Sequence, residues 1–140
     1  MKTVSAIVVF LSLLLQPVYA RDSGQWGNED KALREWYQGL MQPDVPTASC
    51  CGTSDAYWCD DIHTRKEPKK NGEGLVDVTV CKITDDRDDI SRGRHHIPMG
   101  TEIVIPNNKL KWDSGNPTGH AIVFVNSNNY VFCFVQGGGV

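Results

Sequence analysis

The sequence predicts an α+β domain. One N-terminal amphipathic helix packs on a small, strongly bent antiparallel sheet or open barrel, and disulfides stabilise the fold. Three observations lead to this prediction. An apolar stripe with helical period lies early in the chain, two β-branched and aromatic runs lie near its end, and five cysteines follow an export-like leader. With 140 residues, 40% of them hydrophobic, the chain can bury one modest core.

The two late runs, residues 121–125 and 130–135, are separated by four small polar residues, as in a β-hairpin. Neither run alternates apolar with polar residues, so both faces of the hairpin should be covered. We therefore place this hairpin at the centre of the sheet. Cys133 lies within its second strand, where a disulfide would tie the sheet to another part of the chain.

The helix is predicted from residues that recur at i, i+3, i+4, i+7 and i+8: Leu33, Trp36, Tyr37, Leu40 and Met41. Asn28 is the expected N-cap, Glu29 and Asp30 suit the first turn, and Pro43 ends the helix.

Three further strands are expected, at residues 56–61, 75–83 and 101–105. The middle one is the clearest, with Val76, Val78 and Val80 on one face. The basic cluster at residues 65–70 contains a proline and leads into a glycine-rich turn, so we expect a solvated loop there.

The first 20 residues have the pattern of a signal peptide: a positive Lys2, an apolar stretch over residues 4–15 and a small residue, Ala20, at the cleavage position. The alternative is an uncleaved anchor, but the stretch is short for the ~30 Å hydrocarbon core of a membrane. We expect a flexible tail at residues 21–27, a single globular domain at 28–140 and no transmembrane segment in the mature chain. The expected location is periplasmic or secreted. The net charge of −3 and the absence of a basic stripe argue against nucleic acid as a partner.

Export favours disulfides, and an odd number of cysteines leaves at least one sulfur over. We expect Cys51 or Cys50 to pair with Cys133, closing a loop that restricts the unfolded chain by roughly 4 kcal/mol. Cys59 and Cys81 can pair across neighbouring strands.

No metal or cofactor is expected. His95 and His96 are adjacent and would point to opposite faces of a strand, and the acidic run at residues 85–89 lacks the glycine and glutamate of a calcium loop.

A catalytic alternative comes from residues 119–125, which look like the histidine-bearing strand of secreted Cys/His peptidases that cleave peptidoglycan. In this alternative Cys51 is the nucleophile, His120 activates it and Asn128 orients the histidine. The polar residues after Cys51 argue against it, because such a nucleophile normally begins an apolar helix.

The binding interpretation rests on the turn-rich loop at residues 113–119. A hairpin needs an entry loop, but this one is dense in turn residues and would present polar side chains at one end of the sheet. The expected ligand is a small molecule, a glycan or an envelope protein. The predicted binding residues are Asp85, Arg87, Arg94, His96, Trp112, Asp113, Asn116 and His120.

Several short motifs form a signature: Ser49-Cys50-Cys51-Gly52, residues 55–58, 83–89, 93–94, 96–98 and 109–120, and Cys133-Phe134-Val135. In these segments the chain resembles a family of small exported bacterial proteins without an assigned activity. The resemblance covers roughly residues 36–138. It implies bacterial export and a common fold, with Cys59 and Cys81 as an optional extra pair, and it supplies no catalytic residues.

Overall fold

The computed structural model describes residues 30–86, 97–113 and 115–138. The elements, in chain order, are α1 (Lys31–Gly39), β1 (Asp55–Trp58), β2 (Asp61–Pro68), β3 (Leu75–Lys82), β4 (Glu102–Ile105), the short 3₁₀-helix η2 (Asn107–Lys109), β5 (Leu110–Lys111), β6 (Ile122–Val125) and β7 (Val131–Val135). Within the described residues, no helix has the length and apolar character needed to cross a membrane. The predicted signal peptide and the tail at 21–27 lie outside these ranges and stay predictions.

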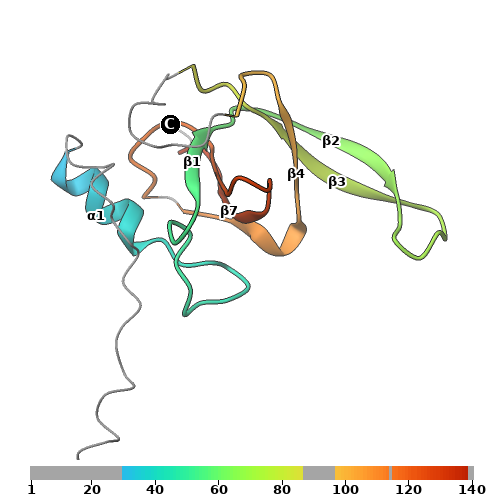
Figure 1. Ribbon diagram of the computed structural model, residues 1–140, viewed down its shortest axis with the longest axis horizontal. Helices are drawn as coiled ribbons and strands as arrows, with labels where there is room; N and C mark the ends of the chain where they lie inside the picture. The colour runs from blue at the N-terminus through green and yellow to red at the C-terminus, as the bar shows by residue number, and fades with distance from the viewer. Residues whose placement is uncertain (1–29, 87–96, 114, 139–140) are drawn as a thin grey trace, which may run out of the picture.

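The strands form two sheets, where the sequence led us to expect one. The first has the order β1-β6-β7-β5 and the second has the order β2-β3-β4. Figure 1 shows α1 on one side of the first sheet and the second sheet on the other. The pairing is antiparallel except between β5 and β7, which run parallel. The chain is therefore mostly β, with one short helix among its described elements.

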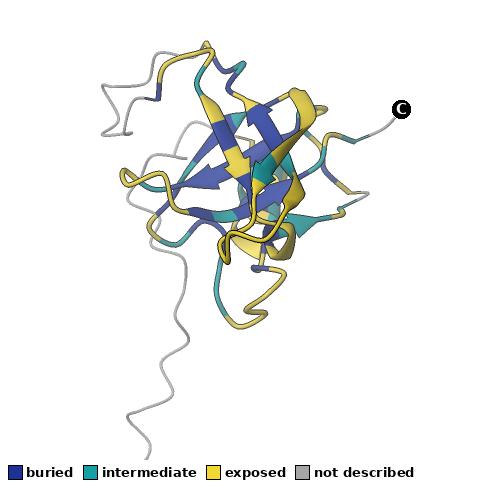
Figure 2. Ribbon diagram, turned by 90° about the vertical axis from the view of Figure 1, so that its right-hand side faces the viewer, coloured by how far each residue is buried: buried dark blue, intermediate teal, exposed yellow. Residues whose placement is uncertain are grey.

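The β6–β7 hairpin lies in the middle of the first sheet, as predicted, and both of its faces are covered. Every residue of β6 is buried. Ile122 and Phe124 belong to a core cluster shared with α1, whereas Val123 and Val125 belong to a second cluster shared with β3 and β4. The unbroken apolar runs in the sequence reflect this double coverage (Figure 2).

The helix α1 overlaps the stretch where the apolar period was found, but it ends at Gly39, before the predicted end at Pro43. Its N-cap is Asp30, whose carboxylate accepts hydrogen bonds from the backbone N–H groups of Ala32 and Leu33. The expected cap, Asn28, lies outside the described residues. Tyr37 is buried, and its ring meets Phe124 edge-on at a centroid distance of 6.0 Å. The aromatic stripe of the helix thus packs on the central hairpin.

The prediction of a loop at residues 65–70 is wrong, because Arg65 to Pro68 form the end of β2. This strand is almost wholly exposed and carries no apolar alternation. It is held by its full-length pairing with β3 and by cross-strand ion pairs, Lys66 with Asp77 at 2.9 Å and Arg65 with Glu102 at 2.7 Å. The result is a long hairpin that projects from the body of the molecule (Figure 1).

Two disulfides join the layers. Of the two predicted partners of Cys133, the structure has Cys50, and the pairing Cys51–Cys133 does not occur. Cys59 pairs with Cys81 as expected, linking the segment between β1 and β2 to β3. Cys51 remains a free, buried thiol.

Candidate functional site

His120 and Asp60 form a side-chain pair at the start of the central hairpin. His120 Nδ1 lies 2.8 Å from Asp60 Oδ2, and the other oxygen, Asp60 Oδ1, accepts the backbone N–H of Ala121 at 2.7 Å. An ionised carboxylate only accepts hydrogen bonds, so Nδ1 carries the shared proton. In the neutral ring the lone pair then resides on Nε2. The His120 side chain is 38% exposed, so this nitrogen belongs to a group that solvent reaches.

Trp58 fixes the plane of the imidazole. The two rings are stacked with centroids 4.0 Å apart and planes 13° apart. The indole is held in turn through its backbone, because the Trp58 N–H donates to Asp85 Oδ2 at 3.2 Å. Thr84 adds a further contact, since its hydroxyl accepts the backbone N–H of Asp60. Both the direction and the tilt of the His120 ring are therefore set by neighbouring groups.

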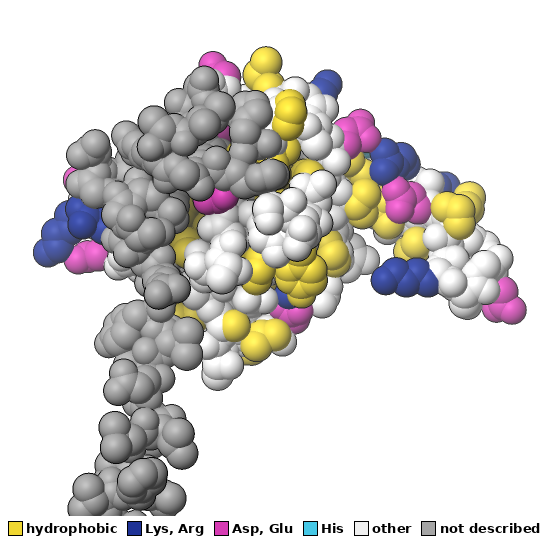
Figure 3. All heavy atoms as spheres, viewed as in Figure 1, with side chains coloured by type: hydrophobic (Ala, Val, Ile, Leu, Met, Phe, Trp, Pro, Cys, Tyr) yellow, Lys and Arg dark blue, Asp and Glu magenta, His cyan; other side chains and the backbone are white. Residues whose placement is uncertain are grey.

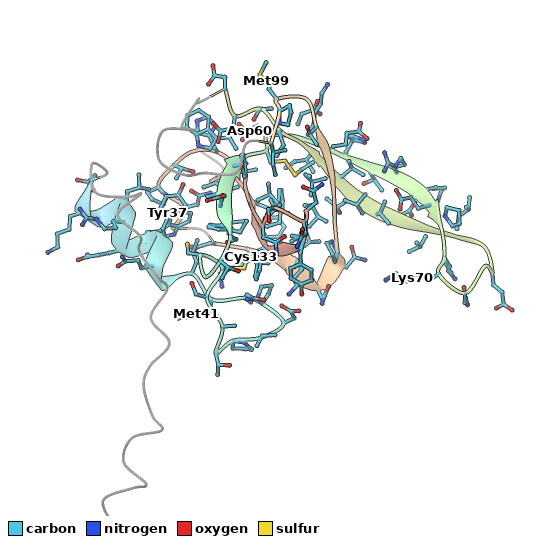
Figure 4. The ribbon with its side chains drawn as sticks, viewed as in Figure 1. Tyr37, Met41, Asp60, Lys70, Met99 and Cys133 are labelled. Carbon is cyan, nitrogen blue, oxygen red and sulfur yellow. A yellow bond between two sulfur atoms is a disulfide. The ribbon has the colours of Figure 1, made fainter. Side chains whose placement is uncertain are left out.

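Strand register brings these residues together. In the β1–β6 pair, Trp58 lies opposite Ile122, and the pairing continues as the N–H of Cys59 donates to the carbonyl of Ala121. One step further along this antiparallel ladder, Asp60 comes opposite His120. Figure 4 shows Asp60 where the chain leaves β1 for β2. The sequence predicted His120 but not Asp60 or Trp58. A known β1–β6 register would have identified both.

Asn116 supports the site from within the entry loop. Its amide nitrogen donates to the carbonyls of His120 and Gln136 at 2.8 and 2.9 Å, and its amide oxygen accepts from Thr118 N–H and Oγ1. The side chain is 7% exposed. Asn116 therefore positions the His120 backbone and offers little surface to a ligand.

The other predicted binding residues have different roles. Asp113 accepts hydrogen bonds from Trp36 Nε1 and from the backbone of Gly115, and the buried carboxylate of Asp85 accepts the backbone N–H of Trp58. Trp112 is 81% exposed. Asp85 and His120 thus both contact Trp58, Asp85 at its backbone N–H and His120 at its ring. Three predicted residues lie outside the described ranges: Arg87, Arg94 and His96.

The free thiol of Cys51 is not placed for nucleophilic chemistry. It is buried, its sulfur donates to the carbonyl of Tyr37 at 3.0 Å, and burial raises its pKa to about 12. Among the described hydrogen bonds, none joins Cys51 to His120, and His120 is oriented by Asp60, not by Asn128. This geometry argues against the Cys51–His120 hydrolase.

A second polar cluster surrounds Lys109, which sequence reasoning did not identify. Its ammonium group lies 2.7 Å from Asp44 Oδ2 and 3.1 Å from Gln42 Oε1, with the ring of Tyr130 5.5 Å away. The hydrogen bond from Lys109 lowers the pKa of Asp44. The Lys109 side chain is 5% exposed, so its charge is neutralised inside the fold. This cluster anchors the loop after α1 to η2.

In the part of the chain that the structure describes, no three His, Cys, Asp or Glu side chains are grouped as metal ligands. Comparison with family models, with curated proteins and with solved structures finds no match for the chain.

Proposed function

We propose that the protein is an exported binding module of the bacterial envelope, and that the imidazole of His120 is its principal recognition group. The observation that carries the proposal is the combination of a fixed ring and a partly exposed side chain. Asp60 and Trp58 hold His120 in one orientation, and the side chain remains 38% exposed. Fixed polar groups lose less conformational freedom on binding, which favours affinity.

The ring nitrogen that does not contact Asp60, Nε2, limits the chemistry of the ligand. With Nδ1 donating to Asp60, neutral Nε2 accepts a hydrogen bond from a hydroxyl or amide group. Sugar hydroxyls and peptide amides both provide such donors, so a glycan, a small polar molecule or an envelope protein fits the site. The net charge of −3 gives no support to nucleic acid.

Export is supported by the leader pattern of residues 1–20 and by the two disulfides, which persist in oxidising compartments. The hydrolase alternative requires a nucleophile beside His120, and Cys51 is bonded elsewhere with a raised pKa. Binding therefore accounts for the paired Asp60 and His120 better than cysteine catalysis does.

The test is an NMR titration of the ¹⁵N-labelled mature protein with N-acetylglucosamine oligomers and soluble peptidoglycan fragments. We expect ligand-dependent shifts at His120, Asp60 and Trp58, and we expect His120→Gln to abolish them. The matched control is Asn128→Ala, in the exposed turn at the other end of the hairpin, which should bind as the wild type does.

A separate measurement examines the geometry itself. Imidazole ¹⁵N shifts of the neutral ring should report a proton on Nδ1, and Asp60→Asn should remove that preference because an amide can donate to the ring. Asp61→Asn, one residue further along, should leave it unchanged. Shifts confined to surfaces away from His120, or a proton found on Nε2, would contradict the proposal.

A further inference from the structure

The strand β4 covers only half of β3, and this leaves an open strand edge. β3 pairs with β2 along its whole length, from Leu75 to Lys82, but its pairing with β4 ends at Thr79 opposite Ile105. Pro106 follows, and proline has no N–H to continue the ladder. The four residues from Leu75 to Val78 therefore have a strand on one side, and no described strand lies on the other.

The hydrogen-bonding groups on this edge can be assigned by alternation. Toward β4, the N–H of Ile83 donates to the carbonyl of Thr101, and toward β2, the carbonyl of Gly74 accepts the N–H of Lys69. Successive residues of a strand direct their backbone groups to opposite sides in the sheet plane. The odd-numbered residues of β3 thus face β4, so the backbone groups of Leu75 and Asp77 face the open side.

The side chains along this edge do little to block it. Leu75 is 58% exposed and Val76 is 38% exposed. The charge of Asp77 is already paired with Lys66. Natural sheets normally protect such edges with charged side chains, prolines or bulges, and Asp77 is the one charged residue of the four. Figure 3 shows hydrophobic side chains among the charged ones on the projecting hairpin.

We infer that this edge binds an extended peptide segment of another protein, which adds to the second sheet as a strand antiparallel to β3. Such a segment would continue the line of β4 and receive backbone hydrogen bonds from Leu75 and Asp77. This inference does not depend on the His120 site, which lies in the other sheet.

The neighbouring side chains specify the chemistry of the segment. Val76, Val78 and Val80 lie on one face of β3, and Val104 of β4 lies opposite Val80. The residues of the bound segment that lie opposite Val76 and Val78 would share that face with Val104, so they should be apolar and β-branched. The C-terminal end of the segment approaches the hairpin turn, where Lys69 and Lys70 have no described ion pair (Figure 4). Acidic residues suit that end. A second copy fits poorly, because self-pairing centred on Asp77 would oppose two aspartates and both copies carry net negative charge.

The probe is the peptide acetyl-Thr-Val-Thr-Val-Thr-Glu-Glu, titrated into the ¹⁵N-labelled mature protein. We expect shifts localised to residues 75–78 and slower hydrogen exchange at the amides of Leu75 and Asp77. A peptide N-methylated at the two threonine amides that would face these residues should bind about five- to tenfold more weakly, since it cannot donate to the edge.

The protein variants test the same edge from the other side. Asp77→Pro removes the N–H that faces the partner and should lose about five- to tenfold in affinity relative to Asp77→Ala, which removes the same side chain but keeps the N–H. If Asp77→Pro does not fold, the test rests on the comparison of the N-methylated and unmethylated peptides with the wild-type protein. Equal binding of the methylated peptide, or self-association through residues 75–78 in sedimentation experiments, would overturn the inference.

Discussion

At the scale of single residues, Cys51 distinguishes a structural thiol from a catalytic one. Its neighbour Cys50 takes the disulfide to Cys133, and Cys51 itself lies against the Tyr37 carbonyl with its pKa raised to about 12 by burial. Since the thiolate is the reactive form, the native protein should resist iodoacetamide at pH 8, and the denatured, non-reduced protein should take up one label. Mass spectrometry counts the labels.

The same raised pKa has a consequence for stability. The unfolded thiol has a pKa near its ordinary value of 9.0, whereas burial raises the pKa of the folded thiol to about 12, so raising the pH from 9 towards 12 favours unfolding. Cys51→Ala should lack this alkaline destabilisation. In the iodoacetamide experiment the same variant is the control that takes up no label. Rapid alkylation of the native wild type would bring back the Cys51–His120 hydrolase as the better hypothesis.

At the scale of elements, the entry loop before β6 depends on one amide. Asn116 donates to two backbone carbonyls, those of His120 and Gln136. Asn116→Asp would turn an oxygen toward each of them and leave them without donors, so we expect it to lower the free energy of unfolding by about 2–4 kcal/mol. Urea unfolding measures this. Asn128→Asp, the same change at an exposed turn, should stay within about 0.5 kcal/mol.

The Asp44–Lys109 ion pair anchors the loop after α1 to η2. The contribution of this pair to the free energy of unfolding should depend on pH. The folded-state pKa of Asp44 is lowered by the hydrogen bond from Lys109, below the 3.8 expected for the unfolded chain. Ionised Asp44 therefore stabilises the folded state above pH 3.8, and this stabilisation is lost as the pH falls through the folded-state pKa.

Asp44→Asn should accordingly lower the melting temperature at pH 6, and the difference from wild type should shrink at pH 3 and below. Asp61→Asn provides the control, because its ion pair with Lys82 is exposed at 4.0 Å and should contribute little. A difference between wild type and Asp44→Asn that is the same at both pH values would contradict the role assigned to this pair.

The elements also differ in how well the sequence predicts them. β6 and β7 were predictable because burial on both faces requires unbroken apolar runs. β2 was missed because its charged residues, such as Arg65 and Lys66, obtain their order from β3 and from ion pairs, which local pattern does not encode. The β5–β7 parallel pair rests on two residues of β5 and leaves no local signal.

The candidate site shows the same limit. His120 could be predicted from its place before an apolar strand, and Asn116 from its turn-rich loop. Their partners could not, because Asp60 reaches His120 through the register of β1 on β6. Asn116 was expected to face a ligand, yet its side chain bonds to other protein groups: Thr118 in the loop and the carbonyls of His120 and Gln136. Residue type suggests which groups can do chemistry, and register decides which of them meet.

At the scale of the whole molecule, three layers follow one another: α1, the first sheet and the second sheet. Disulfides between distant parts of the chain hold them together. The Cys50–Cys133 disulfide, seen at the labelled Cys133 in Figure 4, joins the segment after α1 to β7 across 83 positions. The Cys59–Cys81 disulfide joins the crossing point between the two sheets to β3 across 22 positions. All four sulfurs are fully buried, so the loss of packing on substitution is similar for both pairs. The difference between the two disulfides therefore lies in the loops they close.

In the chain-entropy model, a loop of 83 residues restricts the unfolded state by about 4.5 kcal/mol and one of 22 residues by about 3.4 kcal/mol. Replacing Cys50 and Cys133 by alanine should thus cost about 1 kcal/mol more than replacing Cys59 and Cys81, as measured by urea unfolding of each double variant. Non-reducing peptide mapping of the wild type provides the companion measurement and should recover Cys133 linked to Cys50, with Cys51 free. The opposite ranking, or a peptide joining Cys51 to Cys133, would show that the early segment is fastened to the sheet differently. The burial of Cys51, and with it the argument against a cysteine nucleophile, would then have to be revised.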